Sequence, residues 1–540
     1  MTDCETVVVD GASLTPDDVA AVARRGATVE IAEDARAAVV ASRERVEEIV
    51  ESGQTAYGLN TGFGQLVDTR IEESEIERLQ TNLLRSHASG AGRPLDEEEV
   101  RAMLLTRLNA LVKGYSGVRE VVVDHLATML NERVHPVVRS RGSLGASGDL
   151  APLAHLSLVL IGEGEATVDG ERLAGADALA TAGLTPLTLA SKEGLALING
   201  TQLTTGIAAL LVVDAERVCE AADAAGALTT EVTMGTTANC NPAVQRVRPH
   251  AGQAAVAERI RALTADSEIV ESHANCDRVQ DAYSIRCLPQ VHGAVRDAVD
   301  HLREAVEVEL NSATDNPLVF DVRESLSDSR ARPDSKSSGD AAGADGRATG
   351  TDESVVISGG NFHGEPLALR LDYFVSALTE LAAISERRVD RMVNPNLQEE
   401  HLPPFLTPEP GLNSGFMIPQ YTAASLINEM RATGRPSMDN TPVSGGQEDH
   451  VSMSATSAFA AKSALENART VVAVELLTGA QASEFVDDSL AHGRGTSVAY
   501  RVVREASPPV VEDRSLDGDM EAVAGLIADG TLSKRLAAEL

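Results

Sequence analysis

Four long segments that favour helix constrain the fold of this chain more than any other feature. They are rich in Ala, Leu, Glu and Arg, contain few internal Gly or Pro residues, and lie near residues 204–225, 291–312, 364–393 and 452–482. Several exceed the length of an ordinary globular helix, and long helices of this kind pack as a bundle. The sequence therefore predicts a mainly α-helical protein in which a long helical bundle follows residue 200.

The first third of the chain mixes short strands with helices. Two runs of β-branched residues, Thr6–Val9 and Thr28–Ile31, predict short strands. Residues 96–113 predict a helix that begins with a capping-box pattern at Asp96 and Glu99. Its apolar residues recur at the spacing of one helix face, namely at Val100, Met103, Leu104, Leu108 and Leu111.

We expect three consecutive regions along the chain. Residues 1–200 would form a mixed N-terminal lobe, residues 201–482 the central bundle, and residues 483–540 a polar, partly helical tail. Residues 321–353 are rich in Asp, Ser, Gly and Ala and contain almost no large apolar residue. Such a segment cannot bury enough surface to offset the entropy of ordering, so we expect a flexible acidic insertion in a loop.

Charge and cysteine content restrict the class of protein. The formal net charge is -35, and only five of the 46 basic residues are lysines. An acidic surface disfavours nucleic acids and anionic membranes, and it is typical of a high-salt cytoplasm, where salt screens the repulsion between carboxylates. The five cysteines form no C-x-x-C pair, which favours a reducing compartment. With no signal peptide and no membrane-length apolar run, we expect a soluble, cytoplasmic, halophilic protein.

The segment Gly142–His155, GSLGASGDLAPLAH, could supply an electrophile. Its central Ala146-Ser147-Gly148 is small enough for the Gly148 nitrogen to attack the Ala146 carbonyl, and glycine permits the strained backbone that this needs. Loss of water and dehydration of Ser147 would leave an exocyclic methylidene on a five-membered ring. No ordinary side chain is an electrophile, so this group would supply chemistry that otherwise needs a bound cofactor. The alternative for the bare triplet is a glycine-rich turn.

This fourteen-residue segment resembles the signature of the aromatic amino acid ammonia-lyases, which carry the group 4-methylidene-imidazol-5-one (MIO). Further motifs that resemble the same family lie at 57–64, 197–202, 280–287, 311–317 and 359–363. The resemblance covers nearly the whole chain outside the 321–353 insertion. It implies that MIO forms autocatalytically from the triplet with no external cofactor. It also implies the fumarase/aspartase-like helical fold and a homotetramer whose active sites are shared between subunits.

The resemblance also implies roles for three residues in separate motifs. Tyr57 would take the β-proton of the substrate, because a tyrosine phenol can accept a proton if its pKa is lowered. Asn199 would hydrogen-bond the substrate carboxylate or the MIO oxygen. Phe362 would line the pocket. Separately from the resemblance, the position of Asp149 directly after the triplet suggests the hypothesis that it orients the backbone during cyclisation.

The run Gln280–Cys287 carries three more candidates. At helical spacing, Gln280, Tyr283 and Arg286 would lie on one face. By resemblance, Arg286 anchors the substrate carboxylate through two parallel bonds, Tyr283 assists near the reacting centre, and Gln280 supports the MIO group. Without the resemblance, this run would be a helix face with a surface salt bridge.

Two positions bear on the substrate. His87 follows Ser86 at the position where lyases for histidine carry Ser-His, whereas phenylalanine lyases tend to carry Phe-Leu and tyrosine lyases His-Leu. An imidazole side chain can form a hydrogen bond with a polar substrate ring, whose nitrogens would otherwise be buried without a partner. Glu448 stands where lyases for carbocyclic amino acids usually carry glutamine, and a carboxylate can pair with an imidazolium or the leaving ammonium. The resemblance therefore implies conversion of L-histidine to trans-urocanate and ammonia, the first step of histidine degradation. Whether MIO adds to the amine or the ring, and whether Tyr57 or Glu448 is the base, stay open.

Three other functions stay under consideration. Another MIO enzyme, a tyrosine or phenylalanine lyase or an aminomutase, is disfavoured by His87 and Glu448. A fumarase-like enzyme without MIO is disfavoured because its Gly-Ser-Ser loop is not apparent. A non-catalytic helical assembly would leave the triplet uncyclised. We expect no metal site, since the sequence has no His-Glu-x-x-His motif or tight Cys/His cluster, and we expect His155 and His363 to form structural hydrogen bonds.

Overall fold

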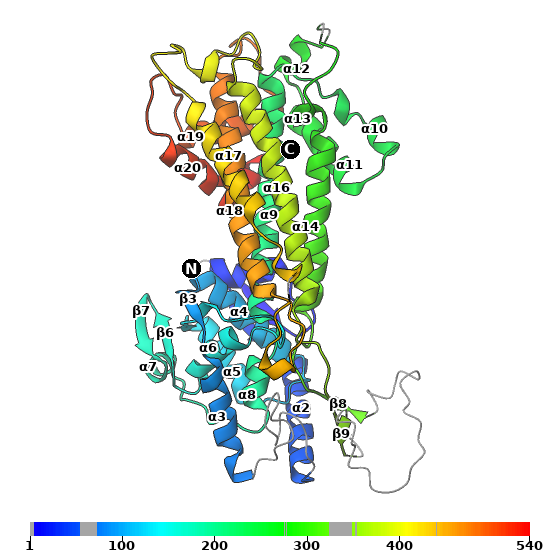
Figure 1. Ribbon diagram of the computed structural model, residues 1–540, viewed down its shortest axis with the longest axis vertical. Coiled ribbons are helices and arrows are strands. Elements are labelled where there is room, and N and C mark those ends of the chain that lie inside the picture. The colour runs from blue at the N-terminus through cyan, green and yellow to red at the C-terminus, as the bar shows by residue number, and fades with distance from the viewer. Residues whose placement is uncertain are drawn as a thin grey trace. The chain divides into compact units, whose positions relative to one another are not determined.

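A computed structural model describes residues 5–53, 73–274, 276, 278–322, 348–351, 354–438 and 440–540 (Figure 1). Contacts divide the chain into two compact units. The first comprises Met1–Leu210, Arg303–Leu371 and Arg435–Phe459. The second comprises Leu211–Leu302, Asp372–Gly434 and Ala460–Leu540. Each unit thus combines segments that are distant in sequence, and the tail belongs to the second.

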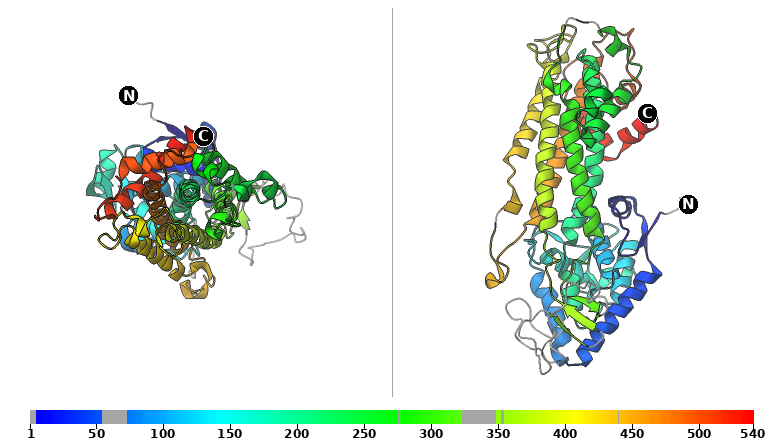
Figure 2. Two further views of the ribbon diagram at one scale, coloured as in Figure 1. Left: turned by 90° about the horizontal axis from the view of Figure 1, so that it is seen from above. Right: turned by 90° about the vertical axis from the view of Figure 1, so that its right-hand side faces the viewer.

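The four segments expected to be long helices all form them. They are α9 (Gln202–Val232), α14 (Leu288–Leu310), α16 (Glu365–Val393) and α18 (Ser454–Ser483). Four of the five boundaries between the units fall inside these helices, one in each, and the fifth lies outside them, between Gly434 and Arg435. Within the second unit the four helices run side by side (Figures 1 and 2). The predicted helical bundle is confirmed.

A buried polar chain links these four helices within the second unit. Arg388 of α16 and Glu475 of α18 form an ion pair of 2.5 Å between Nε and Oε1, with neither side chain exposed. The Arg388 guanidinium also donates to Nε2 of His292 in α14 at 3.2 Å. His292 Nδ1 lies 2.8 Å from a carboxylate oxygen of Asp223 in α9. Because an unpaired buried charge is strongly unfavourable, this chain of contacts favours one register of the four helices.

The remaining helices of the second unit are shorter. They are α10 (Pro242–Arg246), α11 (Ala251–Leu263), α12 (Glu268–Ser272), α13 (Tyr283–Arg286), α17 (Met417–Ala432), α19 (Arg494–Ala506), α20 (Asp517–Ala528) and α21 (Thr531–Ala537). The last three of these helices lie within residues 483–540.

The first unit surrounds a helical core with small sheets. Its helices are α1 (Pro16–Ala20), α2 (Glu33–Glu51), α3 (Ile76–His87), α4 (Glu97–Val112), α5 (Glu120–Asn131), α6 (Leu150–Leu160), α7 (Gly175–Thr181) and α8 (Glu193–Ile198). Its strands are β1 (Thr6–Val9), β2 (Thr28–Ile31), β3 (Ala91–Pro94), β4 (His135–Pro136), β5 (Arg139–Arg141), β6 (Glu165–Val168), β7 (Glu171–Ala174), β8 (Leu318–Asp321), β9 (Ala348–Gly350) and β10 (Ser354–Ile357).

The two strands predicted near the N-terminus form a parallel pair, with Thr6 opposite Thr28 and Val9 opposite Ile31. In a second sheet, β10 lies between β8 and β9. Val319 and Val356 of this sheet pack against Val46 and Ile49 of α2. Strand β9 falls inside the 321–353 segment, so its last part is ordered sheet rather than the expected flexible loop, because β10 supplies a paired edge. Most of the remainder of that segment lies outside the described residues.

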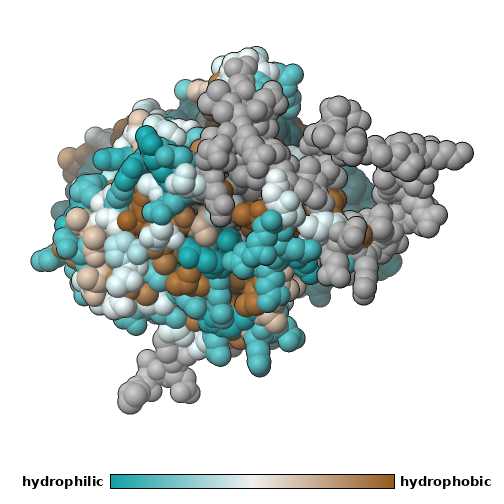
Figure 3. All heavy atoms as spheres, turned by 90° about the horizontal axis from the view of Figure 1, so that it is seen from below, coloured by the Kyte–Doolittle hydropathy of each residue, from teal (hydrophilic) through white to brown (hydrophobic). Residues whose placement is uncertain are grey.

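Helix α4 begins as predicted, with both bonds of the Asp96–Glu99 capping box present. The expectation of a single apolar face is wrong, because every residue from Glu99 to Val112 is buried. Polar side chains on its other faces find internal partners, so Arg101 is 2% exposed and Arg107 is 0% exposed. On the surface drawn in Figure 3, hydrophilic residues surround scattered hydrophobic ones, as is usual for an exposed face.

Candidate active site

The Ala146-Ser147-Gly148 triplet lies in a loop between β5 and α6. Gly148 has φ +73°, and a Cβ atom there would lie 2.2 Å from the carbonyl oxygen of Gly200. No other residue type fits this close approach without displacing the backbone. The Asp149 N–H donates to the same Gly200 oxygen at 2.7 Å. The triplet is therefore held against the turn that follows α8.

Two further segments of the first unit hold the start of this loop. The Gly145 carbonyl accepts from the Gly364 N–H at 3.0 Å and from the Ser452 hydroxyl at 3.1 Å. The Met453 N–H donates to the Leu144 carbonyl at 2.8 Å. The loop is thereby fixed on both sides of the triplet.

Asn199 contacts the triplet directly. Its Nδ2 donates to the Ser147 carbonyl oxygen at 2.8 Å, and its own Oδ1 is buried with no partner among the described residues. The residue follows α8 as its C-cap and is 4% exposed. A donor at this oxygen stabilises negative charge that develops there.

Arg107 of α4 fixes the backbone of Asn199. Its guanidinium donates to the Asn199 carbonyl at 2.9 Å, to Gln202 Oε1 at 2.7 Å, and to the Ala196 carbonyl. Burial lowers the pKa of Arg107 to about 10, so the group stays charged at neutral pH. A cation is favourable here, since the C-terminal end of α8 carries partial negative charge.

Asp149 is fully buried behind the triplet. Its carboxylate accepts from the Ser143 hydroxyl at 2.7 Å and from the Thr204 N–H at 2.9 Å. Burial raises the pKa of Asp149, although these hydrogen bonds oppose the shift. These contacts hold Asp149 in place beside the triplet, and its role in orienting the backbone during cyclisation stays a prediction.

A cavity of about 930 Å³ opens beside the triplet within the first unit. Six of the predicted site residues line it: His87, Ala146, Ser147, Asn199, Phe362 and Glu448. Other lining residues include Leu83, Leu150, Leu195, Asn316, His363, Glu365, Asp449 and His450. The structure therefore brings together motifs that span most of the chain.

The described lining of the cavity is acidic and contains no basic Lys or Arg side chain. It contains three carboxylates, those of Glu365, Glu448 and Asp449. His87 Nδ1 donates to the Leu83 carbonyl at 2.9 Å, which leaves the other ring nitrogen, Nε2, without a partner among the residues described here. A neutral His87 would thus present an acceptor. The cavity suits a ligand that carries N–H groups, and the described lining offers no cation for a ligand carboxylate.

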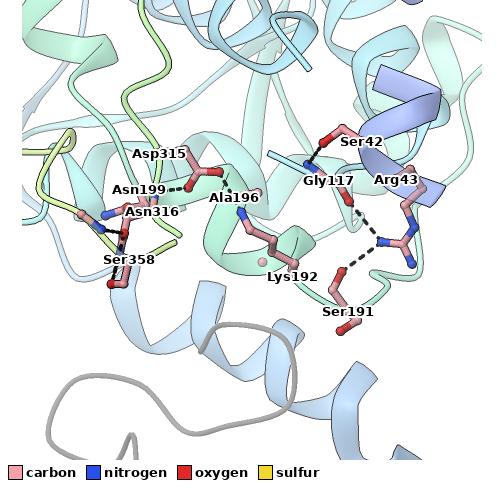
Figure 4. A network of polar contacts seen from close by, with 12 residues as sticks. Ser42, Arg43, Gly117, Ser191, Lys192, Ala196, Asn199, Asp315, Asn316 and Ser358 are labelled. Carbon is pink, nitrogen blue, oxygen red and sulfur yellow. Dashed lines mark hydrogen bonds and ion pairs between the residues drawn. The ribbon is translucent and has the colours of Figure 1, made fainter. Parts of the chain in front are cut away.

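A buried ion pair supports one wall of the cavity (Figure 4). Lys192 Nζ lies 2.9 Å from Asp315 Oδ2, and neither side chain is exposed. Asp315 Oδ1 accepts from the Asn316 N–H at 2.6 Å, and Asn316 Oδ1 accepts from the Gly359 N–H at 2.7 Å. These contacts position Asn316 and Gly359, which both line the cavity.

The two histidines expected to be structural do form hydrogen bonds. His155 Nε2 accepts from the Gly90 N–H at 3.0 Å, and burial lowers the pKa of His155. His363 Nδ1 accepts from the Glu365 N–H at 3.3 Å, but His363 also lines the cavity.

Five predicted site residues are not among those that line this cavity. Gly148 lies in the triplet loop but is not a lining residue. Tyr57 lies outside the described residues. Gln280, Tyr283 and Arg286 belong to the second unit, and Tyr283 is 73% exposed in the single chain.

The prediction that Gln280 shares a helix face with Tyr283 and Arg286 is wrong, because α13 begins only at Tyr283. Hydrogen bonds to another segment of the chain prevent the residues before Tyr283 from forming a helix. Asp281 accepts from the Thr236 N–H at 2.8 Å, and Arg278 donates to the Met234 carbonyl at 3.0 Å. These bonds hold residues 278–282 in a non-helical conformation.

Asn316 and Glu365 line the cavity but were not predicted to do so from the sequence. Asn316 lies inside the 311–317 motif, so this motif could have identified it as a site residue. Glu365 lies two residues after the 359–363 motif and carries no signal of its own in the sequence. In the part of the chain that the structure describes, no group of three or more His, Cys, Asp or Glu residues could hold a metal ion. Among the same residues, no helix is long and apolar enough to cross a membrane.

Comparisons with known proteins cover nearly the whole chain. The family model described as aromatic amino acid lyase matches residues 14–505. The probable histidine ammonia-lyase of Halobacterium salinarum (strain R1) is 62% identical, over 99% of this chain and 98% of the relative. The histidine ammonia-lyase of Caldanaerobacter subterraneus subsp. tengcongensis is 47% identical, over 99% of this chain and 98% of the relative.

Two solved structures cover the chain almost completely. Histidine ammonia-lyase from Trypanosoma cruzi matches with a TM-score of 0.86 and 40% identity, over 99% of this chain and 96% of that one. Tyrosine aminomutase from Streptomyces globisporus matches with a TM-score of 0.88 and 36% identity, over 99% of both chains. Both likenesses support the mainly helical architecture.

Proposed function

Because this chain belongs to the aromatic amino acid lyase family, we propose that it acts as a histidine ammonia-lyase, which converts L-histidine to trans-urocanate and ammonia. One observation carries the proposal: the cavity beside Ala146-Ser147-Gly148 also contains His87 and Glu448. These side chains can accept the N–H groups of histidine, whereas a carbocyclic ring would leave them unpaired and unfavourably buried.

The residues of the triplet fit the formation of MIO. Gly148 has the positive φ and the close backbone packing that only glycine tolerates, and Asn199 and Asp149 fix the peptide groups on either side. When formed, the group supplies an electrophilic methylidene at Ser147. Asn199 Nδ2 would keep its bond to the Ser147 carbonyl oxygen and stabilise negative charge on it.

The reaction removes a proton from Cβ of histidine and ammonia from Cα. The electron pair of the C–H bond becomes the double bond of urocanate. On the family resemblance we assign the proton acceptor to Tyr57, with Glu448 as the alternative. The variants Tyr57→Phe and Glu448→Gln distinguish them, because loss of the base lowers kcat, whereas loss of a ring contact raises KM.

We also propose that another subunit of a homotetramer completes the site. The described lining offers no cation for the substrate carboxylate, and Arg286 could supply it. Tyr283 and Val279, near Arg286, are 73% and 93% exposed in the single chain. Large apolar side chains exposed in this way are typical of a surface that another subunit covers. Co-expression of Arg286→Met with Ser147→Ala tests this: shared sites restore activity in mixed tetramers, and separate sites do not.

The reaction itself is tested by absorbance of urocanate in high salt. L-Histidine, L-tyrosine and L-phenylalanine are supplied in parallel, because a tyrosine aminomutase is among the structural neighbours. Product from L-histidine alone supports the proposal. Product from tyrosine or phenylalanine would assign another MIO reaction, and no product from folded protein would favour a non-catalytic assembly. The acidic composition supports a halophilic, cytoplasmic enzyme, which activity rising with KCl concentration would test.

A further inference from the structure

Glu365 is a cavity-lining carboxylate that the mechanism above leaves without a role. It is the first residue of α16 and follows Gly364, whose N–H is bonded to the Gly145 carbonyl. Gly364 packs closely here, since a Cβ atom on it would lie 2.2 Å from Ser454 Oγ. Glu365 is therefore held immediately beside the loop that carries the triplet.

One oxygen of this carboxylate is unsatisfied. Oε2 of Glu365 is buried and has no hydrogen-bond partner among the described residues. Buried carboxylate oxygens without a donor are unfavourable, and native structures rarely leave them so. Glu365 also lines the cavity, and rotation of its carboxylate would turn this oxygen toward a ligand bound there.

The neighbouring side chains do not supply that donor. The described lining contains no Lys or Arg, and His363 Nδ1 already accepts from the backbone N–H of Glu365. His87 directs its Nδ1 proton to Leu83. Glu365 thus carries an unpaired acceptor beside the loop of the triplet.

We propose that Glu365 is a substrate-binding residue whose carboxylate accepts a hydrogen bond from an N–H group of L-histidine. The inference rests on the proposed function and adds a contact to it. The donor is a cationic or polar N–H, supplied by either the α-ammonium or the imidazole ring, and charge-assisted bonds of this kind are strong.

A second explanation for a glutamate here is its favourable position at the positive end of a helix. Glu33 provides a matched control, because it is also the first residue of a helix, α2, and is exposed outside the cavity. The change Glu33→Gln removes the same charge from the same helical position. Any difference in kinetics between Glu365→Gln and Glu33→Gln therefore arises from the position of Glu365 in the cavity.

The test measures KM and kcat for L-histidine in the wild type, Glu365→Gln, Glu365→Asp and Glu33→Gln, with unfolding midpoints to confirm folding. For Glu365→Gln we expect KM to rise about tenfold to a hundredfold, with a smaller change in kcat, as for loss of one bond to a charged group. Glu365→Asp keeps the charge and should recover part of the affinity. Glu33→Gln should match the wild type.

Calorimetric binding of two probes identifies the donor. Imidazolylpropanoate has the ring without the amine, and L-phenylalanine has the amine without a ring N–H. Weaker binding of the first alone assigns Glu365 to the ring, and weaker binding of the second alone assigns it to the ammonium. Unchanged KM and unchanged binding of L-histidine and both probes to folded Glu365→Gln overturn the inference. A wild type that binds L-histidine but forms no urocanate instead refutes the proposed function.

Discussion

Replacing Arg107 with methionine should damage both the stability of the protein and its catalysis. The buried guanidinium is the donor for the Asn199 and Ala196 carbonyls and for Gln202 Oε1. Methionine has a similar volume, but it is shorter and donates no hydrogen bond. All three acceptors would then be left without this donor.

Two opposing effects set the magnitude. Each buried acceptor that loses its donor costs about 1–3 kcal/mol, so three cost roughly 3–9 kcal/mol. Removing the charge relieves its burial penalty: the lowering of the Arg107 pKa from 12.5 to about 10 corresponds to about 3 kcal/mol. We therefore expect Arg107→Met to lower the free energy of unfolding by about 3 kcal/mol. Displacement of Asn199 from the Ser147 carbonyl should lower kcat by about tenfold to a hundredfold.

Arg101 is the matched control for this prediction. It lies on the same helix, is also buried, and donates to the Val22 and Leu130 carbonyls rather than to Asn199. Denaturant unfolding and urocanate kinetics in high salt would compare Arg101→Met with Arg107→Met. Both should lose stability, but only Arg107→Met should lose kcat. A wild-type kcat in Arg107→Met, or an equal loss in both variants, would refute the assignment of Arg107 as a positioning residue.

Three further changes have defined outcomes. Gly148→Ala should prevent ring formation and abolish activity, because its Cβ would lie 2.2 Å from the Gly200 carbonyl oxygen; a cyclised loop in this variant would contradict the account. Asn199→Ala should lower kcat about 10²- to 10³-fold, and unchanged kinetics would exclude its bond to Ser147 from catalysis. Burial lowers the pKa of His135 from 6.5 to about 4. Between these pH values the unfolded state therefore binds more protons than the folded state. The contribution of His135 to the free energy of unfolding is complete above pH 6.5 and is lost as the pH falls toward 4. The variant His135→Gln should reduce this loss of stability by at most about 3 kcal/mol when unfolding is measured between pH 6.5 and pH 4. If the stability of the variant depends on pH as steeply as that of the wild type, His135 is not the cause of the loss.

Local patterns predicted the elements whose causes are local. The capping box at Asp96 and the β-branched runs of β1 and β2 gave the correct starts of these elements, because their hydrogen bonds and side-chain preferences act over a few residues. The burial of all faces of α4 could not be predicted in this way. It depends on partners for Arg101 and Arg107 that lie far away in the sequence.

The site shows the same division between local and tertiary causes. The motifs that carry His87, Asn199 and Glu448 predicted residues that do line one cavity. The place of Glu365 beside the triplet loop depends on the hydrogen bond from the Gly364 N–H to the Gly145 carbonyl, which the sequence does not display. The prediction from helical spacing failed at Gln280 because the hydrogen bond that Arg278 donates to Met234 and the one that Asp281 accepts from Thr236 override the local preference for helix.

The mass of one peptide tests the central claim most directly. Trypsin cleaves after Arg141 and Arg172, and no Lys or Arg lies between them, so the triplet is released in a single peptide. We predict that this peptide from the wild type is lighter by two water molecules than its sequence requires, and that the Ser147→Ala peptide has its unmodified mass. An unmodified mass for the wild-type peptide, from folded protein, would contradict the claim that this chain makes its own electrophile.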